Sequence, residues 1–403
     1  VPRAARPLNP RGMLDRTARR GPARPVRRSG APATETEKLL AEVFAEVLEL
    51  GRGARVGLDD DFFELGGNSL SATKVVARLR QDAGLETRVQ WFFTDSTVAT
   101  LARRIDQAAA CGVDYEPGTD DALGPLLPIR GEGNLPPLFC FYPMAGLSWS
   151  YAGLLAYVEP NRPVLGLQSP ALSEPDYLPR SLEEMAARCL AEIRSVQPFG
   201  PYHLVGWSLG GLLAHAVAVS LQEAGEEVAL LALLDSHHDI AKADFHTALR
   251  GALAEIGIQA DNLLGDAPAP ALSEDSLAAL HAAIPAELTA LTPERLGRLY
   301  RSAVRSAELI SEHRPGVFKG RVDYFSARIL GANLVRGIDP ENSAVKWRAF
   351  VAGEVVDHPV HATHDEMTSP HALAQIGPTL AARLAPGVRT PGAGPIRHDG
   401  SAR

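Results

Sequence analysis

A serine in a glycine-rich turn is the strongest candidate nucleophile of this 403-residue chain. Ser208 is the centre of the run GWSLG at residues 206–210, between the apolar stretch His203–Gly206 and the Ala- and Leu-rich segment Leu212–Ala224. A G-x-S-x-G sequence between a strand and a helix is the signature of a nucleophile elbow, which exposes a serine hydroxyl at the edge of a sheet. The pattern predicts nucleophilic attack by Ser208 on a carbonyl carbon.

An orienting carboxylate is expected after this serine, because a serine hydroxyl needs an adjacent base that a carboxylate holds in place. Hydrolases with a nucleophile elbow have the chain order serine, carboxylate, histidine. The apolar run Ala229–Leu234 ends directly in Asp235, which would put this carboxyl group at the end of a buried strand. Asp235 is the predicted acid, the alternative being a turn or helix cap.

The base is expected in the loop between the last predicted strand, Glu354–Val360, and the last predicted helix, Pro370–Leu384. Two histidines, His361 and His364, fall in this loop. Either could be an ordinary surface histidine. His364 is the preferred base because it lies deeper in the loop.

Two backbone N–H groups are needed to stabilise the oxyanion that forms on an attacked carbonyl. The N–H of Leu209, directly after the nucleophile, is the first predicted donor. The second is expected after an early strand, and the apolar run Leu138–Tyr142, followed by Pro143 and small residues, has that form. Met144 is the predicted donor, and its side chain can still pack in the core.

A second serine, Ser69, stands at the predicted start of a helix far upstream. It lies in the run DDFFELGGNSLS at residues 60–71, and a helix is expected over Ser69–Ala83. The capping-box sequence TETE at residues 34–37 precedes apolar residues at helical spacing. The pattern predicts a bundle of three or four helices over residues 34–110, in which Ser69 alone would also fit a plain N-cap.

The elements that must position Ser208, Asp235 and His364 begin near Leu126. From there apolar strand-like runs alternate with helical segments, which predicts a mostly parallel sheet with helices on both faces. Besides the last strand and helix, the predicted elements are strands at Leu138–Tyr142, Val164–Leu167, His203–Gly206, Val228–Leu234 and Arg321–Phe325, and helices at Leu182–Gln197 and Leu212–Ala224. The helical stretch 239–312 has no clear strand and is a candidate lid.

Composition argues against several functions. No apolar run approaches the ~20 residues of a membrane span, and no signal peptide is visible. Residues 1–30 hold nine arginines and one acidic residue, but the net charge of the chain is −8. A short, Pro-rich basic arm without aromatic residues on an acidic protein indicates a solvated linker rather than a nucleic-acid site. Three widely spaced cysteines, Cys111, Cys140 and Cys189, fit a reducing cytoplasm better than a disulfide framework or a zinc site.

The run at residues 60–71 closely resembles the phosphopantetheine attachment motif of the peptidyl carrier proteins in nonribosomal peptide synthetases. In that family the serine matching Ser69 carries 4'-phosphopantetheine through a phosphodiester. The resemblance therefore implies a small all-α, four-helix carrier domain over residues 34–110 with this cofactor on Ser69. The family often has histidine where Asn68 stands, and this difference does not affect the attachment chemistry.

Residues 126–385 resemble the C-terminal thioesterase domain of the same synthetases, which has the α/β-hydrolase fold. The runs Phe139–Tyr151 and Gly206–Gly211 stand in matching order, followed by Asp235 and His364. The resemblance implies Ser208 as nucleophile, Asp235 as orienting acid, His364 rather than His361 as base, Met144 and Leu209 as oxyanion donors, and residues 239–312 as the lid.

The run PRGMLDR at residues 10–16 resembles the end of an adenylation domain, where that family has P-N-G-K-x-D-R. Arg11 replaces the asparagine, and Met13 replaces the lysine that contacts the adenylate. So short a remnant cannot adenylate a substrate. The predicted organisation is a remnant and linker (1–33), a carrier domain (34–110), a linker (111–125), a thioesterase domain (126–385) and a tail (386–403).

Together these resemblances imply release of a carrier-bound peptide through an ester on Ser208, resolved by hydrolysis or macrocyclisation. The implied partners are a peptidyl thioester, upstream synthetase modules and a phosphopantetheinyl transferase, and neither a nucleic acid nor a membrane is expected. Two alternatives stay open on the residues alone. One is an esterase or lipase that acts on free small molecules, and the other is a non-catalytic carrier and interaction module.

Overall fold

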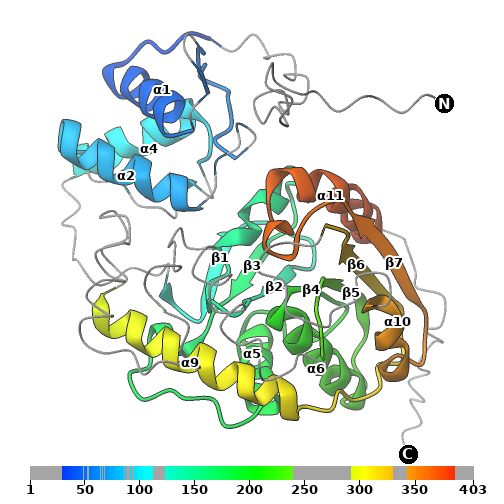
Figure 1. Ribbon diagram of the computed structural model, residues 1–403. Helices are drawn as coiled ribbons and strands as arrows, with labels where there is room; N and C mark the ends of the chain where they lie inside the picture. Colours follow the sequence, from blue (N-terminus) through cyan, green and yellow to red (C-terminus); the bar gives the residue numbers. More distant parts are fainter. Residues whose placement is uncertain are drawn as a thin grey trace, which may run out of the picture.

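The computed structural model in Figure 1 describes residues 30–111, with gaps at 49, 52–53, 64, 66, 68, 86, 88–90 and 93–94, and then residues 123–238, 292–329 and 343–385. Four predicted features lie wholly or mostly outside the described residues: the adenylation-domain remnant, the linker 111–125, residues 239–291 of the lid, and the tail 386–403.

The N-terminal domain is helical, as predicted. Its described helices are α1 (Glu35–Val47), α2 (Ser69–Ala83) and α4 (Val98–Cys111). The predicted capping box starts α1, because the Thr34 hydroxyl accepts the Glu37 N–H at 3.1 Å and the Glu37 carboxylate accepts the Thr34 N–H at 3.0 Å. Each bond pairs a backbone donor that the helix itself leaves free.

Phenylalanine rings form the centre of this domain. Phe62 packs edge to face on Phe44 and on Phe92, with ring centroids 4.8 Å and 5.0 Å apart, and all three side chains are buried. A Cβ on Gly67 would overlap the Phe62 ring. Only glycine therefore lets the loop before α2 lie directly on the Phe62 ring.

Seven strands form one sheet in the order β1-β3-β2-β4-β5-β6-β7. Their bounds are β1 (Leu126–Arg130), β2 (Leu138–Phe141), β3 (Val164–Leu167), β4 (Tyr202–Trp207), β5 (Val228–Leu234), β6 (Val322–Ala327) and β7 (Val355–Val360). All neighbours are parallel except β1 and β3, so the mostly parallel sheet is confirmed. β1 is absent from the sequence prediction because Pro128 interrupts it, and an edge strand tolerates proline.

Helices cover both faces of this sheet (Figure 1). The larger ones are α5 (Leu182–Val196), α6 (Leu209–Glu223), α9 (Pro293–Glu312) and α11 (Pro370–Leu384), with the shorter α10 (Ser343–Trp347) and the 3-10 helix η3 (Trp149–Ala156). Phe139 of β2 packs in the layer of α5, α6 and α10, whereas Leu138 packs in the layer of α11 and η3. Among the described helices, none combines the length and the apolar character that a membrane span needs.

α6 begins at Leu209, directly after Ser208, and not at Leu212 as its apolar segment predicts. Glycine is a poor helix former, so the sequence places the helix start after Gly211. In the structure a Cβ on Gly210 would overlap the carbonyl of Phe141 at the end of β2. Close packing of the helix against the strand, rather than local propensity, decides where α6 starts.

A buried carboxylate ties the last strand and the last helix to the sheet. Asp323 of β6 accepts hydrogen bonds from Arg321 at 2.8 Å, from His358 of β7 at 2.9 Å and from Arg383 of α11 at 2.9 Å. Burial raises the pKa of Asp323, but the hydrogen bonds from His358 and Arg321 outweigh burial and leave this pKa below its ordinary value. Asp323 thus holds both elements that flank the His364 loop.

Candidate active site

Ser208 occupies a strained turn between β4 and α6. Its φ is 56° and its ψ is −124°, a conformation that non-glycine residues rarely adopt and that costs on the order of 1–3 kcal/mol. The Ser208 N–H donates to the Leu234 carbonyl at 3.1 Å, which holds the turn beside the end of β5. The side chain is partly exposed, so the turn presents the hydroxyl at the carboxyl edge of the sheet.

The nucleophile elbow requires glycines because backbone atoms of the strand and the helix approach each other closely there. A Cβ on Gly206 would overlap the carbonyl of Gly210, because α6 folds back over the end of β4. The G-x-S-x-G pattern thus places residues without a Cβ where the strand and the helix touch across the turn.

Asp235 directly follows β5, as predicted. Its φ is 46°, and its N–H donates to the Phe325 carbonyl at 2.8 Å. Its Oδ1 accepts the N–H of Ala327 at 3.1 Å, and the residue is only 2% exposed. Two backbone contacts with β6 therefore fix the direction of this carboxylate.

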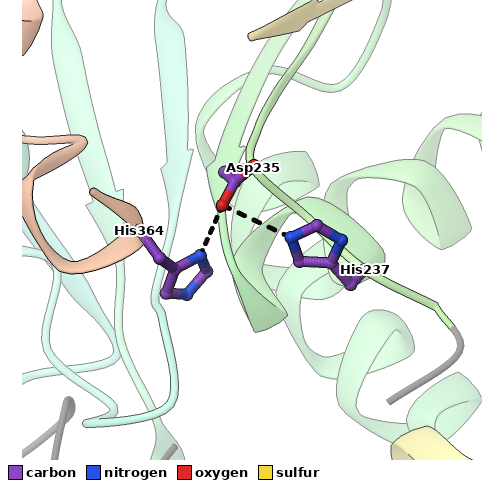
Figure 2. A group of neighbouring side chains, drawn as sticks. All are labelled: Asp235, His237 and His364. Atoms are coloured by element: carbon purple, nitrogen blue, oxygen red, sulfur yellow. Dashed lines mark hydrogen bonds and ion pairs between the residues drawn. The ribbon is translucent and has the colours of Figure 1, made fainter. Parts of the chain in front are cut away.

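His364 lies between Asp235 and Ser208. Its Nδ1 is 2.8 Å from Asp235 Oδ2 (Figure 2), and its Nε2 is 3.1 Å from Ser208 Oγ. His364 begins the 3-10 helix η8 (His364–Glu366), and its carbonyl accepts the indole N–H of Trp207 at 3.1 Å. The structure thus brings the three predicted residues into one hydrogen-bonded line, whereas His361, the alternative base, is exposed.

The charges of the pair are set by its surroundings. Burial lowers the pKa of His364, but the hydrogen bond and the charge of Asp235 outweigh burial, so this pKa lies above its ordinary value. Burial raises the pKa of Asp235, but the neighbouring His237 and His364 hold it well below its ordinary value. An ionised Asp235 accepts the Nδ1–H of His364, which leaves Nε2 free to accept the Ser208 hydroxyl proton.

A pH dependence follows from the raised pKa of His364. The base acts only when neutral, so kcat/KM should fall as the pH drops through a value above about 6.5, the ordinary pKa of histidine. At pH 5.5 we expect less than about one tenth of the plateau rate. A pH profile of thioester turnover measures this, and a midpoint well below 6.5 would contradict it.

The two predicted oxyanion donors lie at adjacent strand ends, after β2 and β4. Within the part of the chain that the structure describes, no backbone hydrogen bond uses the N–H of Met144 or of Leu209. The Met144 side chain is 7% exposed, so it packs in the core while its N–H stays available. α9, the described end of the predicted lid, lies against this loop, since Leu299 would touch a Cβ on Gly146.

Tyr151 is a residue of this site to which the sequence assigns no role. Its phenol oxygen accepts the Trp207 N–H, and its O–H donates to the Phe141 carbonyl, both at 2.7 Å. Phe141 pairs with Gly206 in the β2–β4 ladder, so these are the two groups that would form the next ladder bond. The buried phenol is inserted between them, where the nucleophile and the oxyanion loop leave the sheet.

Replacing Tyr151 with phenylalanine should lower kcat by roughly 10- to 100-fold with little change in KM, because the two strand ends lose the group that spaces them. Two buried backbone groups also lose their partner, which should cost about 1–3 kcal/mol of stability. Steady-state kinetics and thermal unfolding measure both effects. Tyr157→Phe, just after η3, is the matched control, and wild-type kcat in Tyr151→Phe would refute the spacing role.

Ser69 is the first residue of α2, where the sequence places it. Its side chain lies outside the part that the structure describes. The first turn of α2 has no acidic residue, and the unpaired N–H groups of a helix N-terminus favour an attached anion. The position suits a phosphodiester.

Two parts of the chain match known families. Residues 38–105 match the phosphopantetheine attachment site family, and residues 136–304 match the thioesterase domain family.

Similar proteins are synthetases. The chain is 39% identical over 383 residues to CymA of Salinispora arenicola, a probable non-canonical nonribosomal peptide synthetase, and 36% identical over 384 residues to a dimodular nonribosomal peptide synthase of Bacillus subtilis. Each match covers 94% of this chain but only 5% and 15% of these relatives. A four-domain holo nonribosomal peptide synthetase bound to AMP and glycine shares the fold, with a TM-score of 0.54 at 23% identity over 94% of this chain and 28% of that one. The chain therefore contains a carrier domain of the phosphopantetheine attachment site family followed by a thioesterase domain, and proteins similar to it are nonribosomal peptide synthetases.

Proposed function

We propose that this chain releases a peptide from a thioester on its own carrier domain by transferring the acyl group to Ser208. The observation that carries the proposal is the hydrogen-bonded line from Ser208 through His364 to Asp235, with contacts of 3.1 Å and 2.8 Å. It is supported by the thioesterase and phosphopantetheine attachment families that the chain matches. When attached to Ser69, 4'-phosphopantetheine supplies the thiol that carries the peptide as a thioester.

In the first half of the reaction, His364 Nε2 takes the Ser208 hydroxyl proton while Ser208 Oγ attacks the thioester carbonyl carbon. The N–H groups of Met144 and Leu209 hold the oxyanion. The carbon–sulfur bond then breaks, and His364 returns the proton to the departing sulfur. A peptidyl ester on Ser208 is the product of this half.

In the second half, His364 takes a proton from a new nucleophile that attacks the ester carbonyl. Water yields the free acid, and a hydroxyl or amine within the peptide yields a macrolactone or a macrolactam. The Ser208–carbonyl bond breaks, and His364 returns the proton to Ser208 Oγ. Asp235 stabilises the imidazolium in both halves.

Loading and trapping test the proposal together. The chain is loaded on Ser69 with a peptidyl-pantetheine by a phosphopantetheinyl transferase, and the released product is identified by mass. A serine-directed phosphonate is then mapped by peptide mass analysis. Release of an acid or a cyclic product and an adduct on Ser208 support the proposal, and an adduct at another residue or an inert Ser208 overturns it.

The proposal extends to partners and location. A phosphopantetheinyl transferase must modify Ser69, and upstream synthetase modules must deliver the peptide. A cytoplasmic location is supported by Cys140 and Cys189, which are buried free thiols.

A further inference from the structure

A second histidine contacts the carboxylate of Asp235. His237 Nε2 lies 3.3 Å from Asp235 Oδ2, the same oxygen that His364 Nδ1 approaches at 2.8 Å (Figure 2). The ring centroids of the two histidines are 6.0 Å apart. His237 is only 5% exposed, so the residues around it hold its ring in this position. The mechanism above makes no use of it.

The chemistry of the contact favours a proton on His237 Nε2. A lone pair there would face the negative oxygen of Asp235, whereas an N–H would be attracted to it. The separation between His237 Nε2 and Asp235 Oδ2 is slightly longer than a normal hydrogen bond, so the attraction is mainly electrostatic. His364 remains the closer partner of Asp235. The attraction to His237 lowers the free energy of this buried carboxylate.

We propose that His237 is a positioning residue, which holds Asp235 ionised and limits how strongly this carboxylate raises the basicity of His364. The inference rests on the proposed function, because it assigns a role within the same reaction. Because His237 offsets part of the negative charge of Asp235, this carboxylate stabilises the His364 imidazolium less than it would without His237. His237 thus keeps His364 deprotonated to lower pH than Asp235 alone would.

Few other titratable groups face this pair within the described residues. Asp365, next to His364, adds negative charge that raises the pKa of the base. His238 packs its ring on Trp347 and Phe350, with centroids 5.3 Å and 4.7 Å away. Of the two histidines that lower the pKa of Asp235, His237 has the larger electrostatic effect.

The test compares His237→Leu with His237→Gln in the full chain, by the pH profile of kcat/KM for a soluble peptidyl thioester. In the Leu variant the acidic limb should move up by about 0.5–1 pH unit, because the carboxylate loses an N–H neighbour. The Gln variant should return the limb toward the wild-type position, because its amide N–H reaches the place of Nε2. KM should change little in either variant.

His361→Gln is the matched control, since it removes an exposed histidine three residues from the base and should leave the limb unchanged. If the Leu variant does not fold, His237→Asn replaces it, because its shorter amide does not reach Asp235. An unchanged or lowered limb without the His237 donor, or equal shifts in the Leu and Gln variants, would overturn the proposal. Phosphonate labelling of wild-type Ser208 separates this outcome from failure of the proposed function, which would abolish labelling altogether.

A metal ion is the competing explanation for this cluster. The ligand atoms of Asp235, His237 and His364 lie within 4.8 Å of one another, and two histidines with a carboxylate can hold Zn²⁺. The pH profiles are therefore repeated with EDTA. Identical profiles support the positioning role, and loss of wild-type turnover that Zn²⁺ restores would overturn it, because His237 would then be a metal ligand.

Discussion

Replacing Ser208 with alanine should lower turnover of a soluble peptidyl thioester by roughly 10⁴- to 10⁶-fold, because the acyl group then has no acceptor within the site. What remains comes from the oxyanion donors and from substrate binding. The fold should survive, since the partly exposed side chain makes its one described hydrogen bond with His364. Single-turnover kinetics with the wild-type and variant chains measure the loss.

The histidines supply the control for this result. His364→Ala should fall nearly as far as Ser208→Ala, because residues that act as one unit lose activity together rather than additively. His361→Ala should keep wild-type turnover. Retained turnover in His364→Ala with loss in His361→Ala would reverse the assignment of the base, and thermal unfolding shows whether any loss comes from misfolding.

Replacing Ser69 with alanine should abolish release of carrier-delivered peptide. Without its hydroxyl the carrier domain cannot be esterified, so the mass gain of one phosphopantetheine group seen with a competent transferase should disappear. Turnover of a soluble thioester should be unaffected, because Ser69 belongs to a different domain from Ser208. The two substrates thus separate delivery from chemistry within one variant.

The same variant distinguishes the carrier–thioesterase from a free esterase. A tethered carrier presents its cargo at an effective concentration of up to about millimolar, so loaded wild-type chain should release product without added substrate. A mass gain that persists in Ser69→Ala would move the attachment site elsewhere. No mass gain in the wild-type chain would favour an esterase that acts on free molecules.

Elements with a strong local signal could be predicted from the sequence to the residue. Val164–Leu167, Val228–Leu234 and Pro370–Leu384 have the same bounds in the prediction and in the structure. The two strands are continuous apolar runs, which is typical of strands buried on both faces of a sheet, and Ser369 caps the helix at its start. β1 could not be predicted, because Pro128 interrupts its sequence pattern and its place depends on pairing with β3.

Some residues of the candidate site could likewise be predicted from the sequence, and others could not. Ser208 and Asp235 could be located because each directly follows a buried strand. The choice of His364 over His361 depended on loop position and on family resemblance, since a single sequence does not show which loop residue faces Ser208. The role of Tyr151 could not be predicted, because it depends on backbone groups of two strands that are remote from each other in the sequence.

The buried Asp323 has a consequence for the construction of chimeric synthetases. Its partners are spread from Arg321 to Arg383, and removing the partners of a buried ion costs several kcal/mol. A crossover between homologous enzymes inside that interval could join a carboxylate to residues that do not pair with it, and would disturb the support of His364. Exchanges that take β6 through α11 as one block keep this group of charges intact.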